Sequence, residues 1–258
     1  MKTVSRLGLP TSIVVAAFLV GSSIQSAMAG HKFVAADSSK KRIAIVNEQN
    51  QIEWEHRIGP LHDLHLLPNG NLLLQLSWTR IVEMDPASRK VVWQYDAAKA
   101  NGNQGRKVEV HAFQRLPSGD TMIAESGPAR IIEVDKQGKL KCEVKLQVQH
   151  PHPHRDTRLV RKLANGDYLV CHEGDAVVRQ YDEKGKVVWE YAVPLFDKQP
   201  KPGHGVDGFG NKCFAAVRLP NGNTLISTGN GHSVIEVAPD KRIVWSLHQD
   251  DLPGIQLA

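Results

Sequence analysis

Short runs of alternating apolar and polar residues recur along the chain and are separated by turn sequences rich in Gly, Asn and Asp. Four stretches share one order of runs and turns: 62–96, 111–146, 158–193 and 214–249. Their turn glycines, at positions 70, 119, 166 and 222, follow one another at intervals of 49, 47 and 56 residues. No helical period of 3.6 residues runs through these stretches. The pattern predicts an all-β chain built from one repeated unit.

Each repeat is predicted to form four short antiparallel strands. The first strand ends at Asn-Gly or Ser-Gly, a two-residue hairpin signal, because Gly and Asn tolerate positive φ angles. The second strand follows, as at 72–76, and the third alternates apolar and polar residues, as at 81–85. A turn such as 182–185 leads to the fourth strand, as at 187–191. Because one such sheet cannot bury both faces alone, we expect the repeats to pack side by side as blades of a β-propeller.

The segment 32–58 matches the last three strands of a further unit and lacks only the first. The chain therefore contains four full units and one three-stranded N-terminal unit. We expect residues 30–258 to form one β-propeller domain. Two alternatives remain for it: five blades closed with the help of the tail 254–258, or a truncated six-bladed ring whose C-terminal part is incomplete.

Residues 1–29 have the features of a secretory signal peptide. Lys2 and Arg6 precede an apolar run at 13–20, and the segment ends in the small-residue pattern Ala27-Met28-Ala29. The apolar run is shorter than the roughly 20 residues that span a bilayer. We expect cleavage after Ala29 and a soluble, secreted or periplasmic domain with no membrane contact after signal removal. An uncleaved N-terminal anchor is the alternative.

Composition narrows the function classes without naming a function. The chain has a formal charge of +5, and loss of Lys2 and Arg6 with the signal would leave +3. No run of Lys and Arg with interleaved aromatic residues is present, so we expect no nucleic-acid partner. Cys142, Cys171 and Cys213 are too few for a disulfide scaffold, and at least one thiol must stay free.

Tryptophans recur at one position of the predicted fourth strand. They are Trp54, Trp93, Trp189 and Trp245, with Cys142 in that position in the remaining unit. The preceding turns read DKQGK at 135–139 and DEKGK at 182–186. These motifs resemble the tryptophan-docking repeat of PQQ-type quinoprotein propellers over most of 32–250. The resemblance implies that each tryptophan packs between blades. Neither a vicinal Cys-Cys pair nor the acidic metal set of those dehydrogenases is present, and we expect no cofactor.

One rim of the predicted propeller carries short turns and the other carries insertions at 97–110, 147–157 and 194–212. Long loops on a rigid scaffold are where function usually sits. The residues eight positions before the turn glycines are His62, His111, Arg158 and Phe214. Equivalent positions in a ring of blades face a common axis. We therefore expect His62, His111 and Arg158 to converge at the mouth of the central channel.

Further cationic and polar residues are predicted on or beside this rim. The candidate ligand-binding residues are His65, Gln114, Arg161, His172, His204 and His232. Such a mouth suits a small anionic ligand, because arginine contacts sulfate, phosphate or carboxylate in bidentate fashion; a protein partner is the other candidate. Histidines 150, 152 and 154 suggest a metal, but we find no carboxylate at a diagnostic spacing, so a metal stays open. The simplest alternative is a set of polar residues filling a wet channel.

The phrase HDLHLLPNGN at 62–71 resembles the corresponding phrase of the arylsulfotransferase-like secreted propellers. In active members of that family a channel histidine takes the sulfuryl group and cationic neighbours stabilise its charge. The resemblance implies catalytic roles for His62, His111 and Arg158. Two hypotheses result. The first is a secreted or periplasmic propeller that binds a ligand or partner through its His/Arg-rich mouth. The second is an arylsulfotransferase-like or quinoprotein-like enzyme that uses a channel histidine.

Overall fold

The computed structural model describes residues 30–37, 39–59, 61–202, 208–210 and 212–252. The predicted signal peptide 1–29, His204 and the tail 254–258 lie outside these residues. The described part contains 19 β-strands and two 3₁₀ helices, η2 (Gly229–Gly231) and η3 (Gln249–Asp251), which confirms the all-β prediction. None of its helices has the length and apolar character needed to cross a membrane.

The strands form five antiparallel sheets, which we number blade 1 to blade 5 in chain order. Blade 1 contains β1 (Phe33–Asp37), β2 (Arg42–Val46) and β3 (Ile52–Arg57). Blade 2 contains β4 (Leu64–Leu66), β5 (Leu72–Gln75), β6 (Arg80–Asp85) and β7 (Lys90–Asp96). Blade 3 contains β8 (Glu109–Arg115), β9 (Thr121–Ser126), β10 (Arg130–Val134) and β11 (Leu140–Lys145). Blade 4 contains β12 (Val160–Lys162), β13 (Tyr168–His172), β14 (Val177–Tyr181) and β15 (Val187–Ala192). Blade 5 contains β16 (Ala215–Arg218), β17 (Thr224–Ser227), β18 (Ser233–Val237) and β19 (Ile243–His248).

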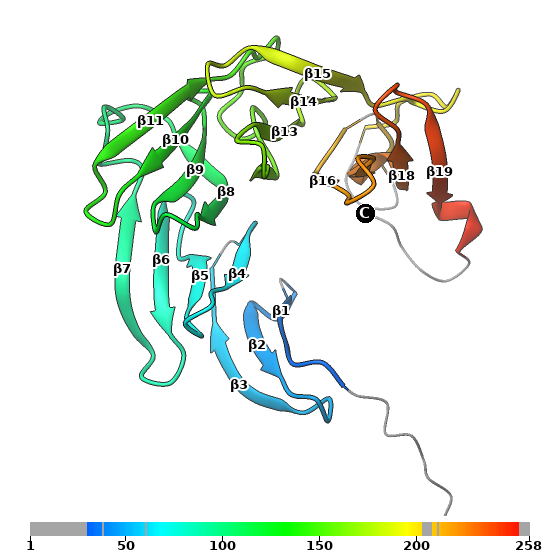
Figure 1. Cartoon of the computed structure of the whole chain (residues 1–258). Helices are drawn as coiled ribbons and strands as arrows, with labels where there is room; N and C mark the ends of the chain where they lie inside the picture. Colours follow the sequence, from blue (N-terminus) through cyan, green and yellow to red (C-terminus); the bar gives the residue numbers. More distant parts are fainter. Residues whose placement is uncertain (1–29, 38, 60, 203–207, 211, 253–258) are drawn as a thin grey trace, which may run out of the picture.

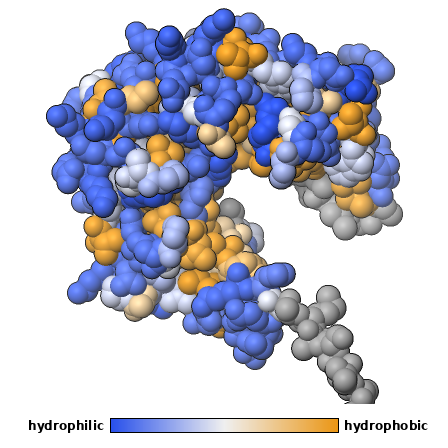
Figure 2. Space-filling view, viewed as in Figure 1, coloured by the Kyte–Doolittle hydropathy of each residue, from blue (hydrophilic) through white to orange (hydrophobic). Residues whose placement is uncertain are grey.

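The five blades are arranged as a five-blade β-propeller. In each four-stranded blade the first strand lies innermost and the last lies on the outside, as β4 and β7 show (Figure 1). Every strand pairs only with its neighbours in the chain, so each blade is a simple meander. Figure 2 shows that the arc of blades is open between blade 1 and blade 5. The predicted count of four full units and one three-stranded unit is confirmed.

The apolar core lies between adjacent blades. Leu73 and Ile81 of blade 2, for example, pack in one buried cluster with Phe113 and Ile123 of blade 3. The alternation of the strands directs one set of side chains toward each neighbouring blade. Burial between blades is therefore what holds the repeats together, as expected for units that cannot bury both faces alone.

Two tryptophans of the fourth strands, Trp93 and Trp189, dock one blade onto the next. The Trp93 Nε1 donates to the Lys136 carbonyl of blade 3 at 2.9 Å, and the Trp189 Nε1 donates to the Pro239 carbonyl of blade 5 at 3.1 Å. The Arg115 guanidinium lies 4.7 Å from the centre of the Trp93 ring, at cation–π distance. Trp93 and Trp189 therefore help to fix the spacing between blades 2 and 3 and between blades 4 and 5.

Candidate functional site

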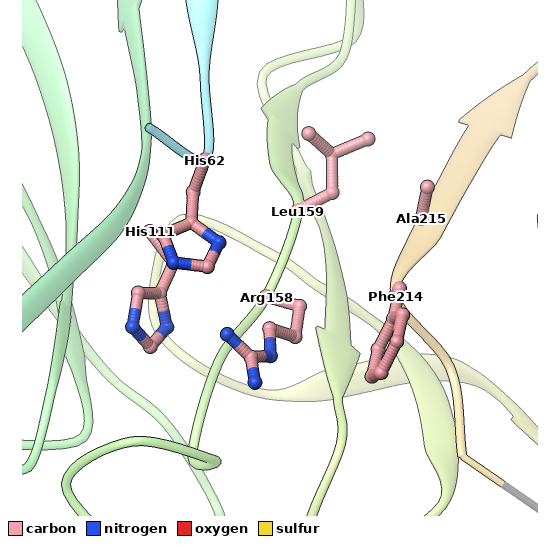
Figure 3. A pocket seen from close by; sticks show the side chains of 6 residues that line it. All are labelled: His62, His111, Arg158, Leu159, Phe214 and Ala215. Atoms are coloured by element: carbon pink, nitrogen blue, oxygen red, sulfur yellow. The ribbon is translucent and has the colours of Figure 1, made fainter. Parts of the chain in front are cut away.

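A pocket of about 270 Å³ lies where the innermost strands of blades 2 to 5 begin. We call it the His/Arg pocket, and its lining residues are His62, His111, Arg158, Leu159, Phe214 and Ala215. Figure 3 shows the two imidazoles close together, with Arg158 between them and Phe214. The structure thus brings together all four residues that stand eight positions before the turn glycines.

A β-bulge in β8 positions His111. Val110 pairs with Glu125 and Ala112 pairs with Ala124, which leaves His111 as the extra residue. Bulges of this kind re-aim a side chain. The side chain of His111 is buried, with its Nδ1 2.7 Å from the Thr157 carbonyl oxygen. Because a carbonyl only accepts, Nδ1 carries the proton, and Nε2 presents its lone pair to the opposite side. Burial lowers the pKa of His111 despite this hydrogen bond.

His62 lies at the open side of the pocket. Its backbone N–H donates to the Gln75 side chain at 2.7 Å, and its ring lies 5.1 Å from Trp78 and 4.7 Å from His111, centre to centre. Within the described residues the ring has no hydrogen-bond partner. Partial burial of the ring, together with the charges of His111 and Arg158, lowers the pKa of His62 to about 3. The lowered pKa keeps the imidazole neutral at pH 7.

Arg158 is held in place from two sides. Its Nε donates to Glu173, and its Nη2 lies 3.1 Å from the His154 Nε2. Its guanidinium carbon lies 5.3 Å from the centre of the Phe214 ring. Glu173 also faces the Lys212 ammonium at 3.4 Å. These three charged groups together carry one net positive charge, and the described residues leave the Arg158 Nη1 without a partner.

Glu109 and His154 also lie beside the pocket. Glu109 was not predicted as a site residue, and His154 was predicted only as one of three histidines that suggest a metal. The Glu109 Oε2 lies 2.6 Å from the His154 Nδ1 and 3.0 Å from the His111 Nε2. Partial burial alone would raise the pKa of Glu109, but its contacts with His154 and His111 lower it. The statement that no carboxylate stands near the histidines at a useful spacing was therefore wrong. Glu109 precedes His111 by two positions in β8, but the β-bulge at His111 interrupts the regular alternation of the strand, so sequence spacing alone did not pair them.

Three of the predicted ligand-binding residues contact protein groups outside the pocket lining. Arg161 donates to both carboxylate oxygens of Asp63, at 2.7 and 2.8 Å. The His65 Nε2 lies 3.1 Å from the same carboxylate. The Gln114 side-chain oxygen accepts the Lys162 backbone N–H at 3.1 Å. These residues connect blades 2, 3 and 4.

His172 and His232 do not reach the pocket lining either. His172 is fully buried, with Nδ1 2.7 Å from the Asp156 carbonyl and Nε2 2.8 Å from the Tyr181 hydroxyl. Both nitrogens are occupied inside blade 4, which corrects the expectation of a ligand contact there. The His232 Nε2 lies 2.6 Å from the Gly208 carbonyl.

The histidine-rich segment at 150–154 does not act as one three-imidazole chelate. The His150 Nδ1 lies 3.2 Å from the Asp175 carboxylate, and the His152 Nδ1 accepts the backbone N–H of His154. Only His154 has its ring beside His62 and His111, with centre-to-centre distances of 6.3 and 5.2 Å.

Fold and site together define a five-blade β-propeller with a His/Arg pocket at the start of its innermost strands. No family model and no curated protein matches the chain. The predicted likeness to quinoprotein and arylsulfotransferase propellers therefore stays a prediction.

Solved structures with the same fold do match. A protein of unknown function from Bacteroides caccae is 21% identical, with a TM-score of 0.66 over 86% of this chain and 74% of that one. A streptogramin B lyase is 11% identical, with a TM-score of 0.58 over 84% and 65% of the two chains. The virginiamycin B lyase of Staphylococcus aureus is 13% identical, with a TM-score of 0.55 over 84% and 66%. This chain thus spans about two thirds of the length of these two lyases. The TM-scores indicate a common fold, and identities this low indicate nothing beyond the fold.

Proposed function

We propose that this protein is a secreted or periplasmic β-propeller that binds a small organic anion in its His/Arg pocket. The observation that carries the proposal is the pairing of two unlike walls. Arg158 and the His62 ring, which has no hydrogen-bond partner among the described residues, offer hydrogen-bond donors on one side. Leu159, Phe214 and Ala215 form an apolar wall on the other. Such a combination suits a carboxylate, phosphate or sulfate carried on an apolar or aromatic body.

Charge and size support the same ligand class. The Arg158 guanidinium favours an anion, because it keeps its donors in a planar fork suited to bidentate contact. The pocket volume of about 270 Å³ is near the small end of ligand sites. A ligand of one ring with one anionic group fits that volume better than a larger molecule. The signal-like segment 1–29 is the basis for the proposed location.

The binding test uses probes that separate the two parts of the ligand. Calorimetric titrations would compare benzoate and phenyl phosphate with inorganic phosphate and with neutral phenol. We expect benzoate and phenyl phosphate to bind more tightly than inorganic phosphate, which lacks the ring, or phenol, which lacks the charge. Loss of a charge-assisted hydrogen bond costs about 1.5–3 kcal/mol, so Arg158→Ala should weaken binding by about 10- to 100-fold. Arg106→Ala is the matched control, because Arg106 is an exposed arginine on the 97–110 loop.

The proposal fails if the aromatic anions bind no better than phenol, or if Arg158→Ala binds them as the wild-type protein does. A protein partner on the same rim is the remaining form of the binding hypothesis. It would be indicated by a pull-down that captures one partner with the wild-type chain and loses it with Arg158→Ala.

One observation favours an enzyme as the second candidate: the lowered pKa of His62, about 3, keeps its ring a neutral nucleophile. In sulfuryl transfer a ring nitrogen would form a bond to sulfur while the sulfur–oxygen bond to the aryl group breaks. The phenolate released takes up a proton, and the sulfuryl group passes to an acceptor hydroxyl. Phenol release from an aryl sulfate, abolished by His62→Ala, would support this reaction. Undetectable turnover by the intact protein would exclude it.

A further inference from the structure

Three metal-binding side chains from two segments meet at one wall of the His/Arg pocket. Glu109 and His111 belong to β8, and His154 belongs to the 147–157 loop. Their donor atoms all lie within 4.8 Å of one another. His111 is the one member that also lines the pocket.

In the neutral form of His111, two hydrogen-bond acceptors face each other: its Nε2 and the Glu109 Oε2. Its Nδ1–H donates to the Thr157 carbonyl, so the neutral ring presents a lone pair at Nε2. That lone pair faces the Glu109 Oε2, itself an acceptor, at 3.0 Å. Two acceptors at this distance need a cation between them, which is either a proton on His111 or a metal ion.

We propose that Glu109, His111 and His154 bind a divalent cation of the zinc class through Oε2, Nε2 and Nδ1. Two imidazoles and one carboxylate are a common protein ligand set for Zn²⁺, with a fourth position left for water or a ligand. The Thr157 carbonyl supplies the outer hydrogen bond that orients a metal-ligating histidine.

The spacing of the donor atoms is close to that of such a site. Metal–ligand distances of about 2.0–2.1 Å in a tetrahedron separate neighbouring donors by about 3.3 Å. The two measured donor distances from Glu109 are 2.6 Å to His154 and 3.0 Å to His111. Binding therefore requires these donors to move apart by less than about 1 Å, which side-chain rotation supplies.

Metal binding also changes the surroundings of Arg158. The arginine only donates, so the His154 Nε2 now accepts from it and the His154 Nδ1 carries the proton toward Glu109. A metal on Nδ1 moves that proton to Nε2, which releases Arg158 from His154. The freed guanidinium and the added positive charge would both strengthen anion binding. The metal site itself does not rest on the proposed anion function.

The test uses the full chain after treatment with a chelator and follows Co²⁺ by its visible d–d absorption. We expect one Co²⁺ per chain, displaced by Zn²⁺, and a rise in the thermal unfolding temperature with either ion. Glu109→Gln and His154→Gln should each weaken Co²⁺ binding by more than about 100-fold. His150→Gln is the matched control, because it lies on the same loop and pairs with Asp175 instead. Circular dichroism checks the fold of each variant. If only one of Glu109→Gln and His154→Gln folds, that variant alone still tests the metal assignment.

Absence of a Co²⁺ spectrum and of any thermal shift would overturn the metal assignment and leave a proton between His111 and Glu109. Wild-type affinity in a folded Glu109→Gln or His154→Gln variant would overturn it as well. Benzoate titrated into the chelated protein and into the Zn²⁺-loaded protein separates the two proposals. Binding of benzoate without any metal uptake leaves the anion function intact, and metal uptake without benzoate binding leaves only the metal site.

Discussion

Asp63 connects three blades through one carboxylate, and its truncation is expected to destabilise the whole propeller. The residue directly precedes β4 in blade 2 and is only 6% exposed. Its Oδ2 accepts the backbone N–H of Phe113 in blade 3 at 3.1 Å. Both of its oxygens accept from Arg161 in blade 4. Asp63→Ala removes all of these contacts, so the Arg161 guanidinium and the Phe113 backbone N–H both lose their carboxylate partner.

The expected size of the effect follows from the burial of the two partners. Removing one member of a buried ion pair costs about 3–5 kcal/mol, because the other charge stays behind. The Arg161 side chain keeps 26% of its surface exposed, and water there partly replaces the lost carboxylate. We therefore expect the lower end, about 3 kcal/mol. For a chain of this length that lowers the melting temperature by about 6–12 °C.

Urea unfolding followed by tryptophan fluorescence measures this effect in Asp63→Ala, in Arg161→Ala and in the double variant. If the two side chains form one interaction, the double variant should lose less stability than the two single losses added together, by about 1 kcal/mol or more. Additive losses, or a change below about 1 kcal/mol in Asp63→Ala, would refute the role given to the pair.

The same ion pair predicts a pH dependence. Burial alone would raise the pKa of Asp63, but interactions with His65 and Arg161 bring it below its ordinary value of 3.8. A carboxyl group whose pKa is lower in the folded state stabilises the fold above the unfolded pKa and loses this effect as pH falls through the folded value. The stability difference between wild type and Asp63→Asn should stay constant from pH 7 to about pH 5 and shrink below about pH 4. A difference that grows on acidification contradicts this assignment.

Three further variants and one reagent test other parts of the structure. Trp93→Ala should cost about 2 kcal/mol in urea unfolding, because it removes a half-buried ring that docks blade 2 onto blade 3; Trp245→Ala, with 47% of the residue exposed, should cost less than about 1 kcal/mol. Cys171 is fully buried and burial raises its thiol pKa, so iodoacetamide should label it only after unfolding, as mass spectrometry would detect. Gly229→Ala should weaken benzoate binding in calorimetry, because the new Cβ would lie 2.5 Å from the Phe214 ring.

The repeat and the pocket could be predicted from sequence because they depend on local rules applied at equal spacing. Gly70 illustrates the first step: its φ of +84° is the left-handed conformation that the hairpin turn requires. A fixed offset from such a glycine marks the same point on each innermost strand. That offset identified His62, His111 and Arg158 as neighbours although about 50 residues separate each from the next.

The rest of the site depends on features that have no local signature. The bulge at His111 appears only in the register of β8 against β9, and it decides how the ring faces Glu109. His154 reaches the same carboxylate because Asp156 holds its loop, accepting the backbone N–H of His152 at 2.5 Å and of Gly127 at 2.9 Å. The first of these hydrogen bonds lies within the loop, and the second joins the loop to the turn after β9. Neither the bulge nor the contact with Gly127 follows from a local pattern, so Glu109 was not predicted and His154 was predicted only as one of three histidines that suggest a metal.

Position along the chain links the stability of the propeller to the geometry of its pocket. Asp63 directly follows His62, and Arg161 lies three residues after Arg158, so the ion pair between blades 2 and 4 also sets the separation of these two pocket residues. A variant of Asp63 should therefore change ligand affinity and stability together. Trp93 docks the outer strands of blades 2 and 3 and contacts no pocket residue, so its variant should change stability alone. Measuring benzoate affinity in both variants at a temperature where both remain folded distinguishes this coupling from a general loss of stability.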